Sequence, residues 1–116
     1  MQPKSAIKKG KELERAIERD LRQSGIDPNA RRNPGSGSGL AKSDIYVPRI
    51  GASVECKNTK TIGLGAWRQA VRDAKKGHTV PILIWKPPYA STDDSLFVAE
   101  WWWVKTILKM AYRERE

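Results

Sequence analysis

The stretches SDIYV at positions 43–47 and SVECK at positions 53–57 decide how this chain is interpreted. Both are rich in residues that favour strands, so they predict two neighbouring strands of one sheet. Side chains alternate between the faces of a strand, which places Glu55 and Lys57 on one face. Asp44 lies in the first stretch, and two carboxylates that converge on a small sheet can hold a hard cation such as Mg2+. A lysine beside them can orient a water or neutralise a phosphate, so the pattern indicates metal-dependent phosphodiester hydrolysis.

An acid followed by Glu-x-Lys is a short pattern, and its structural alternative is an exposed Asp44 beside a cross-strand Glu/Lys pair. The strand context of both stretches favours a site. Glu14 favours it too, because it borders the apolar stripe of a predicted helix and is available as a third acidic ligand. The positive charge of the rest of the chain is what a DNA-binding surface requires.

The charge balance is strongly basic. The 116 residues include 22 Lys and Arg against 13 Asp and Glu, which gives a formal charge of +9. A small domain this basic usually binds a polyanion, and nucleic acid is the first candidate. The alternative is a soluble protein that is simply basic. The length suits one compact domain over residues 1–116.

The cysteine content and the hydropathy of the chain indicate its cellular compartment. One cysteine, Cys56, and one histidine exclude an internal disulfide and a zinc cluster built from these residue types. The chain fits a reducing environment, and we expect a cytoplasmic protein. No apolar stretch reaches membrane-spanning length and the opening residues are charged, so we expect no membrane role. We also expect no small-molecule cofactor.

Apolar periodicity and turn residues predict an α/β protein. Leu13, Ile17 and Leu21 recur every four positions and are followed by Gly25, as in an amphipathic helix with a glycine stop. The apolar run at 81–86 predicts a strand buried on both faces. The predicted helices span about 5–24, 66–76 and 102–113, and the predicted strands span about 30–33, 44–47, 52–58, 81–86 and 95–100. This order, α-β-β-β-α-β-β-α, predicts a mixed sheet flanked by helices.

The segment PGSGSG at positions 34–39 cannot hold regular structure at low cost. One interpretation is a flexible linker. The favoured interpretation is a mobile loop at about 34–42 whose backbone amides and hydroxyls approach phosphates, because loops commonly carry function. The hydroxyls belong to Ser36 and Ser38, and the flanking cations are Arg31, Arg32 and Lys42.

The motifs and their order resemble archaeal-type Holliday junction resolvases, which belong to the PD-(D/E)xK nuclease superfamily. The opening helix of that family carries a Gly and then, four residues on, a Glu-Arg pair, as do Gly10 and Glu14-Arg15. The other similar motifs are Arg32 with Gly35-Ser36, then Ser43-Asp44-Ile45, Val54-Glu55-Cys56-Lys57 and an apolar strand ending in Lys86. The resemblance covers about residues 8–100, and Ser43 departs from the Pro of the superfamily name.

The resemblance implies a restriction-endonuclease-like fold and a set of catalytic roles. Asp44 and Glu55 would bind Mg2+, with Mn2+ as an alternative. Glu14 would complete the metal site directly or through water, and Glu12 is the alternative to it. Lys57 would position the attacking water or stabilise the phosphate. The resemblance also implies a homodimer that cuts opposing strands of a four-way DNA junction.

Several further residues are candidates for DNA contact. The resemblance implies phosphate contacts by Arg15, Arg32 and Ser36. Gln69 follows the Glu-x-Lys strand on the next predicted helix, where it is either near the metal site, as in related nucleases, or an ordinary surface residue. The full set of candidates is Arg15, Arg31, Arg32, Ser36, Ser38, Lys42, Gln69 and Lys86.

Three consecutive tryptophans stand at positions 101–103. Neighbouring residues of a helix point about 100° apart, so all three cannot enter one core. Aromatic residues are enriched in interface cores, and we therefore expect this segment to contribute to a homodimer contact. The alternative is that the strand end and helix start bury all three.

The favoured function is that of a Mg-dependent, structure-selective endonuclease that resolves four-way DNA junctions by paired symmetric cuts. One alternative is a nuclease of the same superfamily that acts on another DNA structure or sequence. Another is a nucleic-acid-binding module that does not cleave. Acidic groups that face phosphates argue against the last, because they weaken binding of a polyanion.

Overall fold

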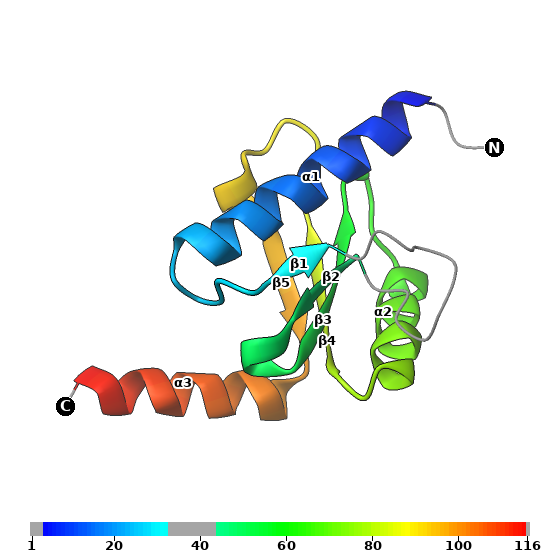
Figure 1. Ribbon diagram of the computed structural model, residues 1–116. Helices are drawn as coiled ribbons and strands as arrows, with labels where there is room; N and C mark the ends of the chain where they lie inside the picture. The colour runs from blue at the N-terminus through cyan, green and yellow to red at the C-terminus, as the bar shows by residue number, and fades with distance from the viewer. Residues whose placement is uncertain (1–3, 33–43, 116) are drawn as a thin grey trace.

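The computed structural model describes residues 4–32 and 44–115, which form a five-stranded mixed sheet flanked by helices (Figure 1). The strands are β1 (Arg31–Arg32), β2 (Ile45–Val47), β3 (Ala52–Lys57), β4 (Val80–Trp85) and β5 (Leu96–Ala99). They lie in this order across the sheet; β3 and β4 are parallel and the other neighbours antiparallel. The helices are α1 (Lys4–Gln23), α2 (Leu64–Lys76) and α3 (Trp101–Arg115), with short 3-10 turns η1 (Pro48–Ile50) and η2 (Thr92–Asp94).

The main hydrophobic core lies between α1 and the sheet. Leu13 and Ile17 of α1 pack in one cluster with Ile45, Val54 and Ile82 from three neighbouring strands. Each of these side chains is buried, and full burial of a side chain of this size contributes about 1.5–3 kcal/mol. The four-residue period of α1 therefore corresponds to the face that it buries.

The other face of the sheet is covered by α2, which provides the crossover between the parallel strands β3 and β4. Its buried Ala70 and Ala74 are small, so the helix can approach the sheet closely. Polar side chains of β3 point to this side: the Ser53 hydroxyl pairs with that of Thr79, and Lys57 reaches α2. The polar residues of β3 thus lie on the side opposite the main core.

A buried carboxylate fixes the turn between α1 and β1. Asp27 is 1% exposed and accepts hydrogen bonds from the backbone N–H groups of Asn29 and Arg49, each at 2.8 Å. The bond from Arg49, followed by the one from Asn29, holds the pKa of Asp27 below its ordinary value. This anchor sets the path of the chain into β1.

The α/β class and the mixed sheet flanked by helices are confirmed, with shifts at the element ends. Helices α2 and α3 begin at Leu64 and Trp101, earlier than predicted, and β2 begins at Ile45, so Asp44 precedes it. The predicted Gly/Ser loop, with Ser36, Ser38 and Lys42, lies outside the described residues.

Candidate active site

Asp44 and Glu55 face each other across the antiparallel pair of β2 and β3. Ile45 pairs with Val54 in the register, so the residue before Ile45 lies opposite the residue after Val54. One oxygen of Asp44, Oδ2, accepts the backbone N–H of Cys56 at 2.8 Å. That bond fixes the Asp44 carboxylate to the strand that carries Glu55.

Glu55 is a buried acid in an acidic environment. It is 3% exposed, and its Oε1 is buried without a hydrogen-bond partner. Burial, the charge of Asp44 and then the hydrogen bond and charge of Asp73 raise the pKa of Glu55 from 4.5 to about 9, against a lowering effect of Lys57. An unpartnered buried oxygen among like charges is a position that a cation would stabilise.

Glu14 of α1 joins the two strand acids from the edge of the core. Burial, and then its hydrogen bond with Asp44 and the charge of Asp44, raise the pKa of Glu14 from 4.5 to about 7. Arg32 acts in the opposite direction, with its Nη2 at 3.7 Å from Glu14 Oε2. Glu12 is exposed and pairs with Lys8 at 4.0 Å, so the structure brings Glu14 rather than Glu12 to the strand acids.

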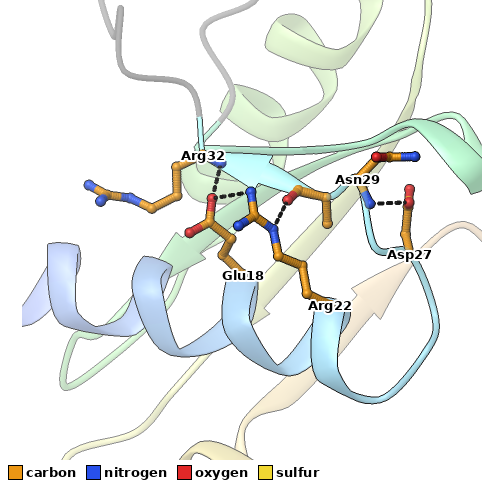
Figure 2. Close-up of polar contacts among 6 residues, drawn as sticks. Glu18, Arg22, Asp27, Asn29 and Arg32 are labelled. Carbon is orange, nitrogen blue, oxygen red and sulfur yellow. Dashed lines mark hydrogen bonds and ion pairs between the residues drawn. The ribbon is translucent and has the colours of Figure 1, made fainter.

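A second network, shown in Figure 2, holds Arg32 beside α1. The Arg32 backbone N–H donates to Glu18 Oε2 at 2.6 Å, and Arg22 Nη2 lies 3.6 Å from the same oxygen. Arg22 Nε in turn donates to the Ala30 carbonyl at 2.6 Å. These bonds fasten β1 to the helix, and they are why the Arg32 guanidinium lies near Glu14.

Lys57 is held from the α2 side. Its Nζ donates to Gln69 Oε1 at 3.3 Å, which links the last residue of β3 to the first half of α2. The sequence allows two roles for Gln69, as a residue near the metal site or as an ordinary surface residue. The structure places Gln69 in contact with Lys57. The amide therefore restricts where the ammonium can lie.

Asp73 is the residue near the site that the sequence analysis missed. It is 7% exposed and hydrogen-bonds with Glu55 from α2. A signal was present, because Asp73 is the only acidic residue of α2 and stands four positions after Gln69, on the same helix face. Cys56 is buried in the core, as expected, and burial raises the pKa of its thiol well above the ordinary value.

Three further DNA-contact candidates, Arg15, Arg31 and Lys86, lie within the described residues. Arg15 is exposed on α1, and the Arg31 guanidinium lies 5.1 Å from the centre of the Tyr46 ring. The backbone N–H of Lys86 donates to the Lys57 carbonyl at 2.8 Å, so the end of β4 adjoins the lysine of the site. Ser36, Ser38 and Lys42 lie outside the described residues.

The acidic residues fit a hard cation by their chemistry. Carboxylate oxygens are the ligands that Mg2+ prefers. Burial, and then the neighbouring acids, raise the pKa values of Glu14 and Glu55, and a bound cation would stabilise their charged forms. Over residues 4–32 and 44–115, however, no group of three or more acidic, His or Cys side chains is arranged to hold a metal as it stands.

None of the helices among the described residues combines the length and apolarity needed to cross a membrane.

The mixed sheet, its flanking helices and the acids beside Glu55-x-Lys57 define a nuclease of the PD-(D/E)xK superfamily. Residues 5–99 match the family described as phage putative PDDEXK endonuclease, and the chain belongs to this family. The match includes the site residues and ends at the last residue of β5, before α3. No curated protein and no solved structure matches the chain.

Proposed function

We propose that this protein is a Mg-dependent DNA endonuclease that resolves four-way junctions by paired cuts. The observation that carries the proposal is the buried, partly unpartnered Glu55 carboxylate opposite Asp44 and beside Lys57. Family membership supports the nuclease class. The choice of a branched substrate rests on the order of motifs shared with junction resolvases.

In this proposal Asp44, Glu55 and Glu14 hold Mg2+, or Mn2+. A cation bound there would polarise the phosphate and lower the pKa of a bound water. Water adds to phosphorus, the phosphodiester P–O bond breaks, and the leaving oxygen takes up a proton.

Lys57 has the role of orienting the water or neutralising the negative charge that develops on the phosphate. Gln69 keeps the ammonium in place through its side-chain carbonyl. Arg15, Arg31, Arg32 and Lys86 have the role of contacting DNA phosphates around the site, together with the loop residues Ser36, Ser38 and Lys42. Residues 1–116 act as one nuclease domain in the cytoplasm.

We further propose that the active form is a homodimer. Two cuts on opposing strands require two sites related by a two-fold axis. The sheet ends in β5, whose Leu96 and Val98 are 52% and 39% exposed. Next to β5 lies an apolar groove of about 590 Å3 lined by Ile62, Leu64, Trp67, Leu83 and Val98, among others. An exposed apolar edge strand is a ready pairing surface for a second copy.

The test is cleavage of a labelled four-way junction with Mg2+ or Mn2+, beside linear duplex, flap and single-stranded DNA. We expect paired symmetric cuts in the junction alone, and loss of cleavage with retained binding in Lys57→Ala. Lys60→Ala is the matched control, because Lys60 is an exposed lysine three residues on and should cleave as wild type does.

The outcomes separate the alternatives. Cleavage of another DNA keeps the chemistry and replaces the junction as substrate. Tight binding without cleavage under either metal contradicts the nuclease and favours a binding module. Light scattering that finds only monomers at working concentration contradicts the dimer.

A further inference from the structure

Helix α3 contacts the core through its first half and lies outside the family match, which ends at Ala99. Its first half packs on the core through Trp103, which is 9% exposed and stacks on Phe97 with ring centres 6.2 Å apart. Val104 and Ile107 are partly buried against the same cluster. From residue 108 to residue 114 every side chain is exposed, so half of the helix lacks tertiary support.

The face of α3 that points away from the core is basic and aromatic. Lys105, Lys109 and Arg113 recur every four residues and are all exposed. The helical period places Trp101, Trp102 and Tyr112 on the same outward side, and they are 66%, 55% and 67% exposed. Four of these residues line a shallow hollow of about 390 Å3 together with Leu108: Lys105, Lys109, Tyr112 and Arg113.

This outward face carries no carboxylate among the described residues. Glu114, the one acid of the described part of α3, falls by the same period on the side of Trp103 and Ile107. Within the described part of the chain, none of the three cations forms an ion pair. All three side chains are exposed, so an anion in solution can approach them.

We propose that the outward face of α3 binds single-stranded nucleic acid, a binding surface separate from the active site. Successive cations are about 6 Å apart along the helix, which suits a charged backbone running beside it. Exposed aromatic rings between such cations are the platforms on which unpaired bases stack. A second copy fits this face less well, because two copies would bring the same cations together.

The position of this surface in the fold indicates its role in the proposed nuclease. This part of the inference rests on the proposed function. β4 runs parallel to β3 and β5 runs back, so α3 begins at the end of the sheet away from Lys57 (Figure 1). A strand bound on α3 is thus held away from the reacting phosphate. The surface would set affinity for DNA with unpaired bases and would leave the chemical step unchanged.

The test measures binding of fluorescent single-stranded and duplex oligonucleotides at several salt concentrations, in the Lys57→Ala background so that no DNA is cut. Replacing Lys105, Lys109 and Arg113 together by Ala should lower the slope of log K against log salt by roughly 2 for the single strand, at about 0.7 per phosphate contact. The matched control exchanges the cations without loss of charge, as Lys105→Arg, Lys109→Arg and Arg113→Lys, and should keep the slope.

The aromatic residues give an independent readout. Trp101→Ala with Trp102→Ala should weaken single-strand binding on the order of tenfold or more, with a smaller effect on duplex and an unchanged salt slope. DNA should quench tryptophan fluorescence less in this variant. Circular dichroism checks that both variants keep their helices.

An unchanged salt slope in the triple Ala variant, in protein that still binds DNA, overturns the proposal. So does light scattering in which the α3 variants turn a dimer into a monomer with the slope unchanged, because the face would then belong to a second copy. Failure of the wild type to cleave any DNA would sink the nuclease proposal and leave the α3 result readable.

Discussion

The two ends of the sheet differ in the burial and the charge of their side chains. Near the end of β3 that carries Lys57, Glu55 and Asp73 are buried, and Asp44 accepts a hydrogen bond from the backbone N–H of Cys56. At the other end, α3 exposes cations and aromatic rings and packs through only a few residues. Chemistry on a phosphate needs groups whose positions and pKa values are fixed by burial. Holding a flexible polyanion needs exposed groups that can adapt, and this is the role that we propose for α3.

Among the substitutions at the active-site end, removal of the buried acid should reduce cleavage strongly. Glu55→Gln should lower cleavage on the order of 10³-fold, because it removes a charge that stabilises the reacting phosphate through the metal. Single-turnover cleavage with saturating Mg2+ measures the effect. Glu12→Gln is the control, since Glu12 is exposed and paired with Lys8, and it should cleave as wild type does. Equal activity of the two variants would show that Glu55 is not in the active site.

A substitution at the active-site end of the sheet should also lower the free energy of unfolding more than a substitution on α3. Ile45→Ala removes a fully buried side chain and should lower the free energy of unfolding by about 2–5 kcal/mol. Leu108→Ala on α3 removes a side chain that is 56% exposed and should change it by about 0.5 kcal/mol or less. Urea unfolding of both variants provides the measurement. A large loss in Leu108→Ala would show that α3 is packed more firmly than its exposure indicates.

The buried acids also predict the sign of a pH effect in metal-free protein. Glu55 has a pKa of about 9 when folded against 4.5 as an ordinary glutamate, so the folded state keeps a proton that the unfolded chain releases. The free energy of unfolding should therefore fall as pH rises from about 4.5 towards 9, with Glu14 contributing up to about 7. Urea unfolding in EDTA at pH 5, 7 and 9 measures this trend.

In Glu55→Gln the fall above pH 7 should largely disappear, and the metal-free variant should be more stable than wild type at pH 9. Parallel pH profiles for the two proteins would mean that Glu55 is not the group that titrates. Added Mg2+ should raise the stability of wild type more than that of the variant, because binding to the folded state stabilises it.

A more modest effect on cleavage is expected from the contact that places Lys57. Gln69→Ala removes the amide that accepts a hydrogen bond from its ammonium and should reduce cleavage about tenfold, with DNA binding retained. Gln69→Glu keeps an acceptor and should recover much of the loss, unlike a variant that only disturbs α2. No change in either variant would remove Gln69 from the support of the site.

The structural features that could be predicted from the sequence were those that depend on neighbouring residues. The apolar period of α1 and the alternation in β3 are properties of neighbouring residues, so the helix and the orientation of Glu55 and Lys57 followed from them. The starts of α2 and α3 were misplaced by two residues and one residue, and α2 begins after Gly63 without a side-chain cap to mark its start. The tryptophans divide as helix geometry requires, with Trp103 buried and the two others exposed.

Local patterns in the amino-acid sequence were enough to predict an α/β fold, a basic chain and an acidic motif with a lysine on one strand face. The distant groups that meet this motif became clear only from the packing of the helices on the sheet. Glu14 rather than Glu12 approaches Asp44, while Gln69 and Asp73 reach Lys57 and Glu55 from α2. The tertiary structure also shows that only the first half of α3 packs against the core. Strand alternation and helical period act over a few residues, whereas these contacts depend on how whole helices lie on the sheet, which only packing of the complete chain fixes.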